Sequence, residues 1–120
     1  MHIGIDNEEV KEFICKGDTE NPTVYIIKNL LHKDKTKLLG DAIDKTGAID
    51  IQKLQERAQD VVRVGLKSIK NIYSKRLGKS VDIDVVDDYA VQLIPYSALI
   101  EIMAAIVQFN FLSETEVKNL

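Results

Sequence analysis

The sequence predicts a small α+β domain that is mainly helical, in which an N-terminal β-hairpin packs on three to four α-helices. Residues 1–30 contain short runs of β-branched and aromatic side chains separated by turn-forming residues. From about residue 34 onward, apolar side chains recur mostly at steps of three and four, as they do on one face of an amphipathic helix. The chain has 120 residues, which suits a single domain over 1–120 with a hairpin region at 1–30 and a helical region at 31–120.

The hairpin region is expected to form two strands, at residues 12–15 and 24–27. Both runs are rich in residues that favour strands, and residues 16–23 between them concentrate Gly, Asp, Asn and Pro. This arrangement predicts a β-hairpin whose loop is longer than the two-residue kind. Residues 2–5 are compatible with a further short strand.

The helical region is expected to begin with a short helix that Asp34 caps and that reaches about residue 45. Asp50 can cap the next helix, because its carboxylate can accept a hydrogen bond from a first-turn N–H. Beyond it the apolar residues keep a mostly helical spacing, so one long helix is expected from residue 51 to about 73. Its apolar stripe consists of Ile51, Leu54, Ala58, Val61, Val62, Gly65, Leu66, Ile69 and Ile72.

Residues 74–88 are interpreted as a polar connection. Within it Val81, Ile83 and Val85 alternate with polar residues, which fits either a short strand or an extended arm. The acidic run at 82–88 lacks the Gly and Glu that an EF-hand calcium loop requires at its sixth and twelfth positions. The run is therefore interpreted as a solvated connector.

A second core helix is expected after Pro95, because proline disfavours helix at the residue before it and suits a first helical turn. The apolar residues of this helix are Leu99, Ile102, Met103, Ile106 and Phe109. Ser113 and Glu116 have the spacing of a capping box, so a short terminal helix is expected to start at Glu114.

Charge is unevenly distributed along the chain. The formal net charge of −3 is made up of +3 over residues 1–80 and −6 over residues 81–120. This asymmetry fits a charged docking surface, and it fits ordinary solvated faces as well. The lone Cys15 cannot form an internal disulfide, no basic leader precedes an apolar run, and the apolar-rich stretch at 89–112 is too interrupted to span a bilayer. These features predict a cytoplasmic protein that does not contact membranes.

No catalytic, cofactor-binding or metal-binding pattern is visible in the sequence. His2 and His32 do not have a metal-ligand spacing, and Cys15 is interpreted as a small buried hydrophobic residue and not as a reactive thiol. The glycines do not cluster into a phosphate-binding loop. The sequence therefore predicts that the protein is not an enzyme and holds no cofactor.

One basic feature is a candidate binding site. Arg63, Lys67 and Lys70 lie four and three residues apart, so they would share one face of the expected long helix. Such a face can neutralise phosphates. The net acidic charge argues against a nucleic-acid partner, and the solvated face of an amphipathic helix explains the same residues.

Three segments carry a resemblance to a known family. Residues 21–28, Asn-Pro-Thr-Val-Tyr-Ile-Ile-Lys, look like the strand that opens many small phage tail proteins. Residues 65–71, followed by Leu-Gly-Lys at 77–79, are similar to the "G-W/L-x-x-(I/V)-x-N" motif and glycine-containing turn of the same group, with Leu66 where Trp is frequent. Residues 112–120 resemble its "L-S-x-E-E-x-K-N-L" terminus. The chain therefore resembles the tail assembly chaperones of long-tailed bacteriophages.

The resemblance implies a non-enzymatic, cytoplasmic role in virion assembly. Chaperones of this kind bind the long helical tape measure protein and help the tail tube to assemble around it. The candidate contact residues are Val24, Tyr25, Ile27, Phe109, Phe111 and Leu112. All of them except Phe111 are also interpreted as core, whereas Phe111 is expected to be partly exposed just past the helix. Two alternatives stay open: a structural virion component that self-associates into a ring, and a small nucleic-acid-binding regulator that uses the basic residues at 63, 67 and 70.

Overall fold

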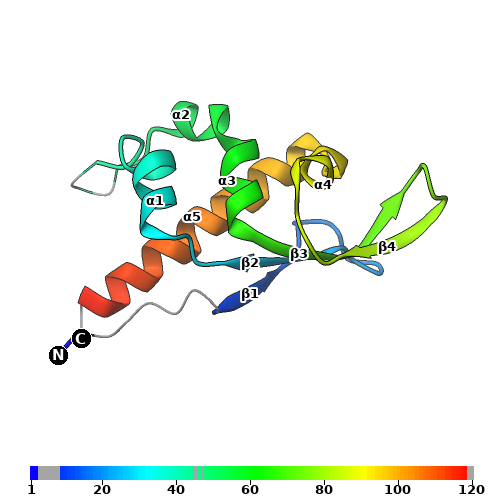
Figure 1. The fold of residues 1–120 in the computed structure, drawn as a ribbon, viewed down its shortest axis with the longest axis horizontal. Helices are drawn as coiled ribbons and strands as arrows, with labels where there is room; N and C mark the ends of the chain where they lie inside the picture. The colour runs from blue at the N-terminus through cyan, green and yellow to red at the C-terminus, as the bar shows by residue number, and fades with distance from the viewer. Residues whose placement is uncertain (3–8, 45, 47, 119–120) are drawn as a thin grey trace.

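The chain forms a four-stranded antiparallel sheet with helices packed on one side of it (Figure 1). The structure is a computed structural model that describes residues 1–2, 9–44, 46 and 48–118, with 111–118 as backbone. Within these residues the elements are β1 (Val10–Phe13), β2 (Val24–Lys28), α1 (His32–Leu39), α2 (Ile51–Glu56), α3 (Ala58–Gly65), β3 (Leu66–Ser74), β4 (Lys79–Ile83), α4 (Asp88–Leu93) and α5 (Tyr96–Lys118). The strand order in the sheet follows the chain order.

The predicted N-terminal hairpin is confirmed. β1 pairs antiparallel with β2, with Phe13 opposite Tyr25. The connection contains two residues with positive φ, Gly17 at +89° and Asn21 at +47°, which are the residue types that tolerate this conformation. The first strand lies two residues before its expected position at 12–15. The further strand considered at 2–5 falls largely outside the described residues.

The prediction of a mainly helical chain is wrong, and so is the long helix expected from residue 51 to about 73. The segment forms two short helices, α2 and α3, and then the longest strand of the described sheet, β3. The chain passes from α3 to β3 between Gly65 and Leu66 with no intervening loop. The hairpin therefore does not pack alone on a helical body, because β3 and β4 extend it into a four-stranded sheet.

Two bulges explain why β3 has a helical pattern in its sequence. Two consecutive residues of β2 pair with Leu66 and Ser68 of β3, which are two residues apart. Likewise, Ile69 and Ile72 of β3 are three residues apart, whereas their partners in β4 are two residues apart. Each bulge adds one residue, so the inward-facing side chains of Leu66, Ile69 and Ile72 fall three residues apart and not two. A spacing of three also occurs on one helix face, and this coincidence misled the prediction.

The short helix predicted at 34–45 begins earlier and ends sooner than expected. α1 starts at His32, and Leu31 at its N-cap makes no side-chain capping hydrogen bond. Asp34 lies in the first turn and is not the cap, where its negative charge still complements the helix dipole. Asp50, by contrast, caps α2 as predicted, since its carboxylate accepts a hydrogen bond of 3.2 Å from the Lys53 backbone N–H.

The segment at 74–88 contains the strand that one interpretation allowed, β4, and is followed by a helix that the sequence analysis missed. Asp87 caps this helix, α4, by accepting a hydrogen bond of 2.8 Å from the Ala90 N–H. α4 ends before Ile94, whose backbone is extended as Pro95 requires. α5 then runs unbroken from Tyr96 to Lys118, so the separate terminal helix expected from Glu114 is wrong.

The core lies between the sheet and the helices, with α5 across its centre. Ile102 and Ile106 of α5 are fully buried, and Gly65 at the end of α3 lets the two helices approach closely. A Cβ added at Gly65 would lie 2.6 Å from Cγ2 of Ile106. Asn110 ties α5 to the end of β2: its Oδ1 accepts a hydrogen bond of 2.7 Å from the Leu30 N–H. Both groups are buried, so this bond satisfies a donor that water cannot reach.

Candidate protein-binding groove and basic arm

The contact residues expected on the hairpin strand and the terminal segment differ in how far they are open to a partner. Tyr25 and Ile27 face the helices and are only 3% and 1% exposed, so a partner cannot reach them while the core is intact. Val24 and Phe109 are half-buried. Phe111 and Leu112 lie on the backbone of α5, and their side chains are outside the described part of the structure.

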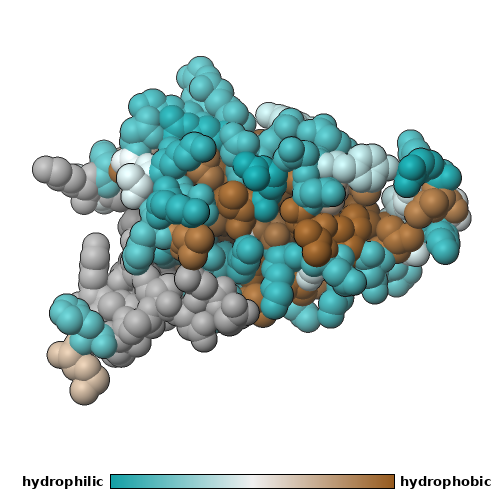
Figure 2. Space-filling view, viewed as in Figure 1, coloured by the Kyte–Doolittle hydropathy of each residue, from teal (hydrophilic) through white to brown (hydrophobic). Residues whose placement is uncertain are grey.

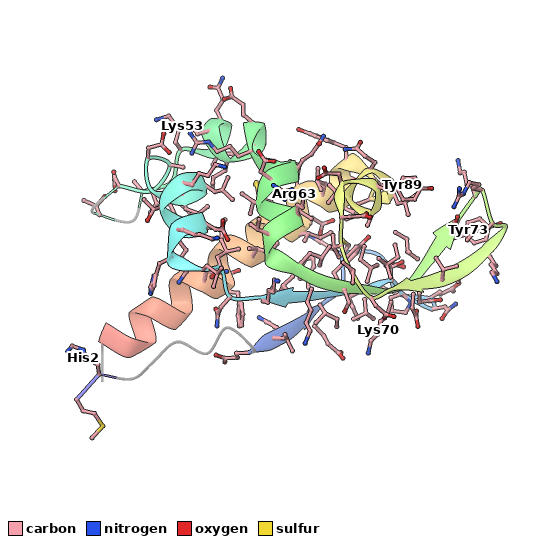
Figure 3. All side chains as sticks on the ribbon, viewed as in Figure 1. His2, Lys53, Arg63, Lys70, Tyr73 and Tyr89 are labelled. Carbon is pink, nitrogen blue, oxygen red and sulfur yellow. The ribbon has the colours of Figure 1, made fainter. Side chains whose placement is uncertain are left out.

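The basic patch predicted on one helix face is not formed. Arg63 belongs to α3, whereas Lys67 and Lys70 belong to β3. Figure 3 shows Arg63 on the helical side of the sheet and Lys70 on the other. Arg63 is also paired, with its Nε 3.3 Å from Oδ1 of Asp88. These three cations therefore cannot bind one stretch of phosphates together.

An apolar groove lies between α2 and α5. Its volume is about 470 Å³. Its rim is open to solvent, since Ile49 and Ile51 are 48% and 63% exposed. The groove is lined by Ile49, Ile51, Leu54, Gln55, Ile100, Met103, Ala104, Val107 and Gln108. No charged side chain is among these residues, so the groove suits apolar side chains and not ions.

The helical periodicity of α5 explains why this groove exists. Leu99, Ile102 and Ile106 point into the core and are buried. One flank of the same helix, with residues at steps of three and four, lines the groove and includes Ala104, which is exposed. Because the alanine side chain is short and α2 has only six residues, the apolar stripe of α5 is wider than the surface that α2 covers.

A second feature is the arm, defined here as residues 72–83, which comprises the end of β3, the turn and β4. It projects from the body of the molecule (Figure 1). Its turn is closed by a hydrogen bond of 2.8 Å from the Gly78 N–H to the Ser74 carbonyl, and Gly78 has a φ of +68°. Figure 2 shows apolar surface along the middle of this face and again at the tip of the arm.

Asn71 fixes the base of the arm. Its φ is +61°, a conformation that Asn tolerates better than most residues. Its side-chain amide donates to the carbonyls of Asn21 and Pro22 at 2.8 and 3.2 Å, and its own N–H donates to the Asp82 carboxylate at 2.9 Å. Thr23 Oγ1 donates to the Asn71 carbonyl at 2.9 Å. The loop after β1 and both strands of the arm are therefore joined through one residue.

Cys15 is held in its unreactive form. Burial, followed by the charge of Glu101 and a hydrogen bond to it, raises the pKa of the Cys15 thiol to about 11. A thiol with this pKa is protonated at neutral pH and is a poor nucleophile. It lines a polar cleft of about 360 Å³ with Asp18 and Glu101. This cleft offers carboxylates without a nucleophile and base pair.

Neither a cluster of metal ligands nor a membrane-spanning helix is found among the described residues. No group of three or more His, Cys, Asp or Glu side chains there is placed to hold a metal ion. None of the helices in that part of the chain combines the length and apolar character needed to cross a membrane.

The comparisons add no relative. No protein-family model, no curated protein and no solved structure matches the chain.

Neither the role of Asn71 nor the groove was predicted from the sequence, and only Asn71 left a signal there. Asn71 ends the motif at residues 65–71, and Asn is a residue type that adopts positive φ. The groove left none, because its lining comes from α2 and α5, which are distant in sequence.

Proposed function

We propose that this protein is a non-enzymatic assembly chaperone that holds an apolar helical segment of a partner protein in the groove between α2 and α5. The observation that carries the proposal is the groove itself, whose lining is apolar and uncharged and whose rim exposes Ile49 and Ile51. An amphipathic helix binds such a groove by inserting apolar residues spaced three or four apart.

The identity of the partner rests on the family resemblance. Residues 21–28 and 112–120 are similar to segments of small phage tail proteins and of tail assembly chaperones, and the partner of such a chaperone is the tape measure protein. Residues 65–71 do not add support, because the resemblance expects a helix where the structure has β3. A tape measure protein offers long apolar helical stripes that aggregate if nothing covers them. The chaperone acts in the cytoplasm of the host cell, before the tail tube forms.

A charge placed in the groove tests the proposal. Ala104 is exposed on α5, so an Ala104→Glu variant adds a carboxylate to the groove without disturbing the core. The matched control is Ser97→Glu, which adds the same charge at an exposed position of the same helix outside the groove. Each variant is co-expressed with the tape measure protein encoded beside it, and the soluble, co-purifying fraction of that partner is measured.

The wild type and Ser97→Glu are expected to keep the partner soluble, and Ala104→Glu is expected to lose it. The proposal fails if Ala104→Glu performs like the wild type, because the groove is then not the contact. It also fails if the wild type does not bind the tape measure protein.

A further inference from the structure

We propose that the arm, together with the residues that flank it, docks against the same surface of a second copy of this chain. In this arrangement the basic segment of one copy, residues 67–79, contacts the acidic segment of the other, residues 80–88. The surface is separate from the groove, so the inference does not depend on the proposed function.

Charge is segregated along the arm and its continuation. The basic segment contains five Lys or Arg residues and no Asp or Glu: Lys67, Lys70, Lys75, Arg76 and Lys79. The acidic segment contains four Asp residues and no Lys or Arg: Asp82, Asp84, Asp87 and Asp88. The two segments are consecutive in the chain, and Arg76 near the end of the first lies over the ring of Tyr89, which follows the second.

The charges of the two segments form no ion pair among the described residues except at Asp88, whose Oδ1 lies 3.3 Å from Nε of Arg63. Further ion pairs join Lys53 and Arg57 to Asp41, and Arg63 to Asp60. None of the five cations of the basic segment takes part in them. Arg76 contacts an aromatic ring instead, since its guanidinium carbon lies 5.7 Å from the centre of the Tyr89 ring.

Exposed aromatic and apolar side chains accompany the two segments. Tyr73, Leu77 and Tyr89 are 62%, 53% and 54% exposed, and Val85 is 78% exposed. Figure 3 places Tyr73 on the arm and Tyr89 on the neighbouring α4. Tyr and Arg are among the residues enriched in protein interfaces, and Tyr buries a large area at a low cost in conformational entropy.

The charge pattern selects a second copy over a nucleic acid. A phosphate backbone would meet the acidic segment at the base of the same arm, and the whole chain has a net charge of −3. A surface that carries both signs in separate segments is complementary to itself when two copies meet about a two-fold axis. Each basic segment then faces the acidic segment of the other copy, so the favourable contacts are made twice.

Reversing the charges on each side tests this arrangement. Lys75→Glu/Lys79→Glu removes two exposed cations of the basic segment that form no ion pair in the described part of the chain. Asp84→Lys reverses an exposed acid and spares Asp87, which caps α4, Asp82, which bonds Asn71, and Asp88, which pairs with Arg63. The control Lys33→Glu/Lys37→Glu makes the same change in net charge as Lys75→Glu/Lys79→Glu, but at exposed positions of α1. Self-association is measured by sedimentation velocity over a concentration series.

The wild type and the α1 control are expected to dimerise, with a dissociation constant that rises about tenfold between low salt and 0.5 M NaCl as surface charges are screened. Each charge-reversed variant alone is expected to be monomeric, and an equimolar mixture of the two is expected to form a heterodimer. In that heterodimer both contacts join opposite charges again. Rescue by mixing cannot result from misfolding of either variant.

Three results would overturn the inference. The first is a wild type that remains monomeric throughout the concentration series. The second is a mixture of the reversed variants that stays monomeric. The third is a monomeric wild type that binds a duplex oligonucleotide through the basic segment, with the binding lost in Lys75→Glu/Lys79→Glu; this result would assign the arm to nucleic acid.

Discussion

The groove and the arm belong to the same small domain, yet they differ in almost every physical respect. The groove lies between two helices and has no charged lining residue, and the short side chain of Ala104 leaves space there. The arm consists of two strands that project from the body, and it carries Lys75, Arg76 and Lys79 at its turn and Asp82 at its base. We therefore expect the binding proposed for the groove and for the arm to respond differently to salt, because apolar burial is insensitive to the screening that weakens charge contacts.

Gly65 joins the two regions, and its replacement is expected to have the largest effect. In Gly65→Ala the new Cβ would lie 2.6 Å from Cγ2 of Ile106, a side chain that is fully buried. Overpacking of this kind is expected to cost about 3 kcal/mol of unfolding free energy. Urea denaturation measures the change, and an unchanged midpoint would show that α3 and α5 can separate easily at this point.

A change at Asn110 tests whether the helical side of the molecule unfolds independently of the arm. Asn110→Ala removes the acceptor of the buried Leu30 N–H, and an unpaired buried donor is expected to cost about 2 kcal/mol. Hydrogen exchange should therefore become faster at the β2–α1 connection and stay unchanged in the arm. Equal acceleration in both places would mean that the two regions unfold as one unit.

Asn71 makes the reciprocal test on the arm. Asn71→Ala keeps an L side chain at a φ of +61° and loses both amide hydrogen bonds, with an expected cost of about 1 kcal/mol from the backbone conformation alone. Asn71→Gly is the matched control, because it loses the same bonds without the conformational cost. The difference between the two midpoints in urea isolates the backbone contribution, and identical midpoints would contradict it.

The smallest effect is expected at the Asp41–Arg57 pair, which links the end of α1 to the α2–α3 junction. Hydrogen bonding from Arg57 lowers the pKa of Asp41 from 3.8 to about 2. A depressed folded-state pKa stabilises the protein above pH 3.8, and this stabilisation disappears as the pH falls through about 2. The thermal midpoint of Asp41→Asn should lie slightly below that of the wild type at neutral pH and coincide with it near pH 2. A constant difference across that range would argue against the pair.

The accuracy of the sequence analysis followed the range of the interactions involved. The hairpin, the Asp50 cap and the helix after Pro95 depend on neighbouring residues, and each was predicted. β3 was not, because two bulges gave its buried residues the spacing of a helix. That error also created the basic patch, since Lys67 and Lys70 share a face with Arg63 only if residues 51–73 are one helix.

The candidate site was harder to predict than the fold. Tyr25 and Ile27 were candidates both for contact and for core, and composition could not choose between the two roles. Pairing in the sheet decides it, because Tyr25 lies opposite Ile69 and so faces the helices. The groove required knowledge of which helices are neighbours, and local patterns do not contain that information.

The surplus residue at the first bulge has a consequence for how the gene can change. Lys67 is exposed, and removal of this codon would restore a regular ladder in which Leu66 and Ile69 still face the helices while Ser68 still faces away. A codon lost from β2, which has no surplus residue, would turn the rest of that strand over and expose its apolar side. β3 is therefore expected to tolerate the loss of one residue at its first bulge, whereas most strands tolerate none. Homologous genes that differ in length by a single codon are expected to differ at this position.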